Sequence, residues 1–121
     1  MLFRSHIFTF DRAWRSAQPY FENAATISPR TALVHTYFGM FLAVAGRTEE
    51  AIAQAELGRQ LDPLAPFSST FAGVVFAILG RLGAAESAAR QAIELQSDFL
   101  PALTALGEIL CRLERSEEAI P

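Results

Sequence analysis

Two kinds of side chain in this sequence could take part in nucleophilic or acid–base chemistry, and both are scarce. The chain has two histidines, His6 and His35, and a single cysteine, Cys111. A thiol beside an imidazole forms an activated nucleophile, so a small helical enzyme using Cys111 and His35 is one hypothesis. We do not favour it, because the chain offers so few groups of this kind.

The acidic residues do not form a recognisable catalytic pattern either. Glu49-Glu50 and Glu117-Glu118 are adjacent pairs, and neighbours on a helix point in different directions, so we expect them to complement helix N-termini. The sequence contains no glycine-rich phosphate loop, no H-E-x-x-H pair and no G-x-S-x-G elbow. One cysteine excludes a disulfide framework within the chain and a cysteine-based zinc site. We therefore expect no enzyme, no cofactor and no metal.

Length and composition indicate one soluble domain. The 121 residues are 51% hydrophobic and carry 13 acidic against 10 basic side chains, a net charge of −3. Nucleic-acid-binding proteins usually carry a clear excess of positive charge, and this chain does not. No apolar run reaches the roughly 18 residues of a membrane span, and the N-terminus does not resemble a secretory signal. We expect no nucleic-acid or membrane partner and a cytoplasmic location.

The strongest signal is a repeat with a fixed period. Gly39, Gly73 and Gly107 are spaced by 34 residues (73 − 39 = 34 and 107 − 73 = 34). The same interval relates alanines, hydrophobic residues, turn glycines and prolines, namely Ala17, Ala51, Ala85 and Ala119; Ile27, Leu61 and Leu95; Gly46 and Gly80; and Pro29 and Pro63. A recurrence across several residue classes predicts an array of equivalent structural units.

Spacing within one period indicates two helices. The chain reads His35-x-x-Phe38-Gly39-x-x-Leu42, and a second stripe of small residues follows at Ala51 and Ala55. Apolar residues three and four apart lie on one face of a helix. This pattern resembles the tetratricopeptide repeat (TPR), which places large, large, Gly and large residues on a first helix and small residues on a second. The resemblance implies an all-α fold, an α-solenoid of antiparallel helix pairs, and places His35 at a core aromatic position.

We divide the chain into a partial unit 1–29, two units 30–63 and 64–97, and a partial unit 98–121. Helices are predicted over about 2–10, 14–27, 31–45, 48–60, 66–79, 84–95, 101–113 and 116–120. Pro19 either lies in the first turn of a helix that begins near Ser16, or kinks that helix.

Several residues mark where these helices should begin and end. Gly46 and Gly80 are expected to adopt left-handed C-terminal caps, and the hydroxyls of Thr48 and Ser116 to cap the helices that follow. Glu114 stands where a third cap glycine would be, so we expect a differently shaped turn there. The glycines inside the first helices should let Ala51 and Ala85 pack closely against Gly39 and Gly73, which would offset the roughly 1 kcal/mol that glycine costs within a helix.

The resemblance also implies a binding groove. In such solenoids the first helices line a concave face, and by analogy we predict a largely apolar groove formed by Leu33, Thr36, Met40, Val44, Phe67, Thr70, Val74, Ile78, Thr104, Glu108 and Arg112. The family's clamp of Lys and Asn for terminal carboxylates is missing at these positions. We hypothesise a protein or peptide partner held as a helix or extended segment, with Glu108 and Arg112 fixing its polarity. The alternative is that the same apolar stripe is core.

A second interpretation concerns the parent protein. The junction 61–66 resembles linkers of long bacterial repeat proteins, so the segment could be a spacer or regulatory part of a multidomain signalling or transcriptional protein. Neither end has the polar cap that repeat arrays normally carry, and we expect the chain to be a piece of a longer array. Self-association through the uncapped ends is a further consequence of such bare faces.

Overall fold

Helices are the only regular secondary structure in the part of the chain that the structure describes. The computed structural model describes the backbone of residues 2–119 and the side chains of residues 15–114. Its six helices are α1 (Leu2–Ile27), α2 (Ala32–Val44), α3 (Thr48–Leu61), α4 (Pro66–Ile78), α5 (Leu82–Leu95) and α6 (Leu100–Ala119). The predicted all-α class is confirmed.

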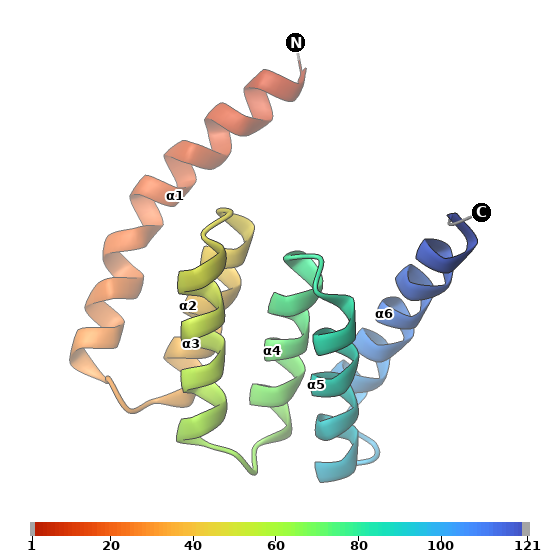
Figure 1. Ribbon diagram of the computed structural model, residues 1–121. Helices are drawn as coiled ribbons and strands as arrows, with labels where there is room; N and C mark the ends of the chain where they lie inside the picture. Colours follow the sequence, from red (N-terminus) through yellow and green to blue (C-terminus); the bar gives the residue numbers. More distant parts are fainter. Residues whose placement is uncertain (1, 120–121) are drawn as a thin grey trace.

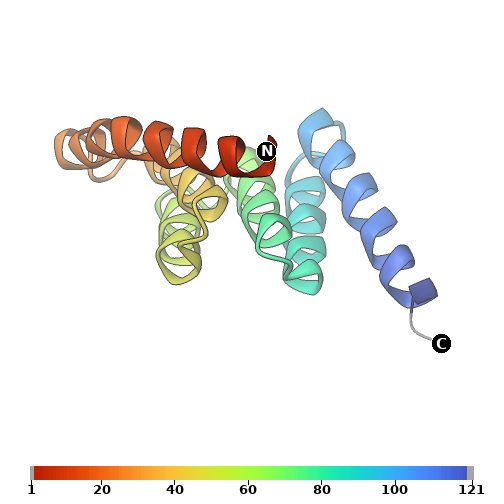
Figure 2. The same cartoon turned by 90° about the horizontal axis from the view of Figure 1, so that it is seen from above.

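Two antiparallel hairpins form the centre of the molecule. Helices α2 and α3 make one hairpin, α4 and α5 make the next, and the two stand side by side (Figure 1). Helix α1 packs against α2 at one end, and α6 packs against α4 and α5 at the other. Seen from above, the row of hairpins ends in α6 (Figure 2). Contacts run only between neighbouring elements, which is the arrangement of a solenoid.

A glycine in the left-handed region closes each hairpin turn. Gly46 has φ +81° and Gly80 has φ +80°. In the first turn the Gly46 N–H donates to the Ala43 carbonyl at 3.0 Å and the Arg47 N–H donates to the Leu42 carbonyl at 2.9 Å. These two bonds are the Schellman pattern that satisfies the last carbonyls of a helix. The predicted left-handed caps are confirmed.

The predicted breaks in the two terminal helices are wrong. Helix α1 runs unbroken from Leu2 to Ile27, past Pro19 and with no start near Ser16, and α6 runs unbroken from Leu100 to Ala119. Arg12 and Glu114 occupy the positions 34 residues before Gly46 and after Gly80. Neither residue favours positive φ, so the helix simply continues where the central units turn back.

The predicted hydroxyl caps are also wrong. Arg47 is the N-cap of α3, Thr48 is already the first helical residue, and no side chain caps this end. Glu49 and Glu50 do lie in the first turn of α3, where their charge opposes the positive end of the helix. Ser116 lies inside α6, and its side chain is outside the described residues.

Close approach of glycine and alanine holds each hairpin together. A Cβ atom placed on Gly39 would lie 3.2 Å from the Ala51 carbonyl oxygen, and one on Gly73 would lie 3.1 Å from the Ala85 carbonyl oxygen. Ala51 and Ala85 are completely buried. The nesting predicted for Gly39 and Gly73 is confirmed. At Gly107 an added Cβ would meet no described atom within 4 Å, because no described helix folds back over α6.

Larger side chains fill the space between the hairpins. The most deeply buried include Leu42 of α2 and Val75 of α4, and Phe38 and Phe76 lie in the same cluster. Helix α1 joins this core through Phe21, whose ring stacks on Phe38 at a centroid distance of 5.6 Å and lies 4.8 Å from the ring of Phe41. Burial of such side chains contributes about 1.5–3 kcal/mol each.

The nesting predicts how a larger residue at Gly73 behaves. Gly73→Leu has to push α4 away from the backbone of α5 and should lower the free energy of unfolding by about 1–3 kcal/mol. The matched control is Gly83→Leu, because a Cβ at Gly83 of α5 meets no described atom within 4 Å. That variant should stay within about 0.5 kcal/mol of the parent in chemical denaturation. Equal stabilities for the two variants would contradict the close approach.

Candidate functional site

One face of the first helices carries large apolar side chains at helical spacing. On α2 these are Leu33, Tyr37, Met40 and Val44, and on α4 they are Phe67, Phe71, Val74 and Ile78; we call these eight residues the apolar face. The ring of Tyr37 lies 6.0 Å from that of Phe71, which makes the surface continuous from α2 to α4. Leu33, Val44 and Ile78 are 44%, 53% and 40% exposed. The other predicted apolar residues, Met40, Phe67 and Val74, are half-buried.

Two of the predicted groove residues do not belong to this surface. Thr36 and Thr70 are 2% and 1% exposed, and each donates its hydroxyl proton to the carbonyl four residues earlier, at 2.8 Å from Ala32 and 2.9 Å from Pro66. Thr36 faces Gly58 of α3 instead, since a Cβ on Gly58 would lie 2.6 Å from its hydroxyl oxygen. Their inward orientation removes both threonines from an accessible surface.

The neighbouring aromatic residues take their place. Tyr37 is 47% exposed and Phe71 is half-buried, and neither was among the predicted residues. Both lie four residues after Leu33 or Phe67 and three before Met40 or Val74. Helical spacing alone could have found them, because residues three and four apart share a face.

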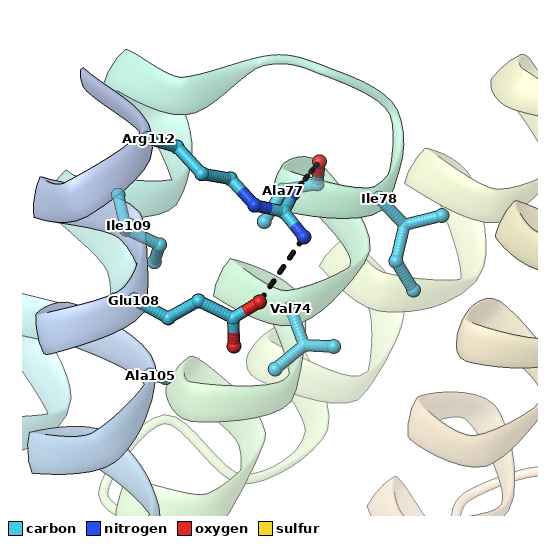
Figure 3. A pocket seen from close by; sticks show the side chains of 7 residues that line it. All are labelled: Val74, Ala77, Ile78, Ala105, Glu108, Ile109 and Arg112. Atoms are coloured by element: carbon cyan, nitrogen blue, oxygen red, sulfur yellow. Dashed lines mark hydrogen bonds and ion pairs between the residues drawn. The ribbon is translucent and has the colours of Figure 1, made fainter. Parts of the chain in front are cut away.

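A small pocket lies where the apolar face meets α6. Its volume is about 110 Å³, and its walls come from α4 and α6 (Figure 3): Val74, Ala77, Ile78, Ala105, Glu108, Ile109 and Arg112. Four of the predicted groove residues, Val74, Ile78, Glu108 and Arg112, are thus brought together. Thr104 is exposed on α6 but does not line the pocket.

The rim of this pocket is polar and internally paired. One Arg112 N–H donates to the Ala77 carbonyl at 3.1 Å and another to the Glu108 carboxylate at 3.1 Å (Figure 3). The Ala77 carbonyl belongs to the last turn of α4, where a cation is favourable. Both side chains are substantially exposed, so the ion pair adds about 0–1 kcal/mol. Its main effect is to orient the guanidinium across the gap between α4 and α6.

The residues with the most reactive side chains lie elsewhere. His35 is 5% exposed; its Nε2 lies 2.6 Å from the Pro29 carbonyl oxygen and its Nδ1 2.6 Å from Gln54 Oε1. The ring thus ties the segment before α2 to α3. Cys111 is exposed on α6 outside the pocket walls. His6 lies outside the residues whose side chains are described.

The described residues form neither a metal site nor a membrane-spanning helix. No three His, Cys, Asp or Glu side chains gather closely enough to hold an ion within residues 15–114. In the described part of the chain, no helix combines the length and the apolar character needed to cross a bilayer.

Comparison with known proteins gives a consistent result at the level of structure. The chain matches no protein-family model and no curated protein. Among solved structures, it is similar to YrrB, a TPR protein with an unusual peptide-binding site, at 30% identity and TM-score 0.66 over 75% of this chain. It is also similar to the first TPR of Spaghetti (RPAP3) bound to the HSP90 peptide SRMEEVD, at 28% identity and TM-score 0.63 over 74% of this chain and 72% of that one. The chain has a TPR-like fold.

A further TPR neighbour agrees on the architecture. The Sgt2 TPR domain from Aspergillus fumigatus superposes with a TM-score of 0.71 at 18% identity, covering 91% of this chain and 79% of that domain. The chain spans 47% of the length of the YrrB structure. The predicted TPR-like solenoid is therefore confirmed.

The position of His35 leads to a stability prediction for this TPR-like chain. His35→Ala removes a buried ring and both of its hydrogen bonds, and should lower the free energy of unfolding by about 2–4 kcal/mol. Gln54→Ala removes one bonding partner alone and should lower it by about 1 kcal/mol. Urea denaturation of both variants measures the difference. A loss below about 0.5 kcal/mol for His35→Ala would mean that the ring is not a structural link.

Proposed function

We propose that this chain is a non-enzymatic protein-interaction scaffold that binds a peptide or helix of a partner on the apolar face. The observation that carries the proposal is the row of exposed large hydrophobic side chains, Leu33, Tyr37, Val44 and Ile78, on successive first helices. Apolar side chains left in water as one contiguous surface are typical of interaction sites. A pure spacer would gain nothing from them, so the scaffold is preferred over the spacer or regulatory segment.

The chemistry of the surface indicates the kind of partner. Aromatic and aliphatic side chains dominate it, and the rings of Phe67, Phe71 and Tyr37 follow one another at centroid distances of 6.2 and 6.0 Å. Such a surface suits the apolar side of an amphipathic helix or the alternate side chains of an extended segment. The pocket between α4 and α6 is large enough for one aliphatic side chain of that segment.

The charged rim distinguishes this partner from the acidic peptide held by the Spaghetti domain. That domain is bound to the peptide SRMEEVD, which contains three acidic residues. In the present chain the Arg112 guanidinium already binds the Glu108 carboxylate and the Ala77 carbonyl. The Glu108 carboxylate beside it opposes the approach of an acidic peptide. We therefore propose a partner segment that is mainly apolar, with a polar group near Glu108 and Arg112.

Binding of selected peptides tests the proposal. Peptides enriched from a random library against the purified chain should share two or three apolar residues at helical or alternate spacing. Ile78→Asp should weaken them at least about tenfold, because an apolar side chain would then be buried against a carboxylate. Kd is measured by calorimetry, and the midpoint of thermal unfolding is recorded for each variant.

The control is the same kind of charge placed on the second helices. Ala53 of α3 and Ser87 of α5 are exposed and related by the 34-residue period, so Ala53→Asp and Ser87→Asp should leave Kd unchanged. Loss of binding in Ile78→Asp with an unaltered melting temperature supports a binding surface. If Ile78→Asp unfolds the chain, or if all three variants bind alike, the apolar face is not the binding site.

A further inference from the structure

One side of α6 is built to receive a second helix but is left uncovered among the described residues. Leu103, Leu106, Gly107 and Leu110 lie two periods after His35, Phe38, Gly39 and Leu42 of α2. Of these α2 residues, His35 and Gly39 contact α3. In α2, His35, Phe38 and Leu42 are 5%, 9% and 1% exposed. Leu103 is 43% exposed and Gly107 is exposed, while Leu106 and Leu110 are half-buried. We call these four residues of α6 the open face.

The open face arises because α6 does not turn back. In the central units a glycine with positive φ reverses the chain, so that the second helix covers the first. At the corresponding position α6 carries Glu114 and continues as a helix to Ala119. No described residue therefore lies within 4 Å of a Cβ placed on Gly107.

The other end of the chain has the complementary feature. Ala17 and Ala24 of α1 lie 34 residues before Ala51 and Gly58 of α3. The two α3 residues are buried, whereas the two α1 residues are only half-buried. Phe21, between them, instead packs on Phe38 and Phe41 of α2.

The partial burial of α1 reflects a missing neighbour. Among the described residues, α3 packs against both α2 and α4, while α1 packs against α2 alone. Within this part of the chain, residues 15–27 of α1 resemble a second helix without its first, and the open face of α6 resembles a first helix without its second.

We propose that α1 of one copy packs on the open face of α6 of a second copy. The pairing reproduces between two chains the contact that α2 makes with α3 and α4 with α5, with Ala17 of one copy against Gly107 of the other. It continues the stack of hairpins with an interface the chain already uses twice. Because the two surfaces are different, the association is head-to-tail and produces open arrays or closed rings.

The directions of the terminal helices agree with this pairing. The free ends of α1 and α6 both extend from the molecule on the side where the α2–α3 and α4–α5 turns lie (Figure 1). In an antiparallel pair, the two extensions therefore run alongside each other.

Charge also favours the pairing. Glu114 and Arg15 are both exposed, and their equivalents in the first unit, Gly46 and Glu49, are three residues apart around one turn. In the proposed pair these opposite charges lie close together, which contributes modestly to affinity and helps to set the register.

This association is separate from the proposed binding function. The apolar face meets α6 through Ala105, Glu108 and Arg112, whereas the open face consists of Leu103, Leu106, Gly107 and Leu110. Peptide binding and self-association can therefore fail independently in experiments.

Sedimentation velocity of the full 121-residue chain, under reducing conditions and over a wide concentration range, tests the proposal. The parent chain should associate reversibly. Gly107→Gln places a bulky, helix-compatible side chain in the middle of the open face and should weaken association at least about tenfold. Gly83→Gln is the matched control, since a Cβ there also meets no described atom within 4 Å, and it should associate as the parent does. Circular dichroism confirms that both variants fold.

A charge swap tests the register. Arg15→Glu and Glu114→Arg should each weaken association, and the double variant should recover most of the loss because the opposite charges are restored in exchanged positions. A parent chain that is monomeric at every concentration would overturn the proposal. So would a Gly107→Gln variant that associates as strongly as Gly83→Gln.

Discussion

Backbone-to-backbone contact at Gly39 and Gly73 is the constraint on which this structure depends. With no side chain between them, α2 approaches α3, and α4 approaches α5, so closely that the carbonyl oxygens of Ala51 and Ala85 lie only 3.2 and 3.1 Å from where a Cβ would be. This contact sets the separation of the paired helices, and the larger residues, such as Leu42 and Val75, fill the space that remains. A glycine that would weaken an isolated helix is favourable here because the helix is never isolated.

A second glycine decides whether a pair forms at all. Gly46 and Gly80 lead the chain into the left-handed region and back along the preceding helix. Arg12 and Glu114, at the same phase of the repeat, allow the helix to continue, and α1 and α6 are unbroken as a result. Glycine at this phase of the repeat thus accounts for the two closed hairpins. Its replacement by Arg12 and Glu114 accounts for the uncovered surfaces of the two terminal helices.

The sequence predicted the part of the fold that is strictly periodic. The recurrence of Gly39 and Gly73, and of Gly46 and Gly80, was enough to place both hairpins and both turns. The prediction of a turn at Glu114 failed, because it assumed that every residue at this phase of the repeat reverses the chain. Reversal needs a residue that tolerates positive φ, whereas continuation of the helix does not. The site was less predictable. Thr36 and Thr70 were expected in the groove, but their hydroxyls bond back to the preceding turn and face inward. The pocket also depends on the contact of Arg112 with the Ala77 carbonyl across two helices, which no spacing within one helix reveals.

The functional account rests on this geometry, since the stacked first helices are what bring the apolar face together. The most direct measurement of it is a set of nuclear Overhauser contacts in solution. We expect contacts between the Hα protons of Gly73 and the methyl group of Ala88, whose Cβ lies 3.6 Å from a Cβ placed on Gly73. Absence of any contact between Gly73 and helix α5 would contradict the stacked-hairpin structure itself.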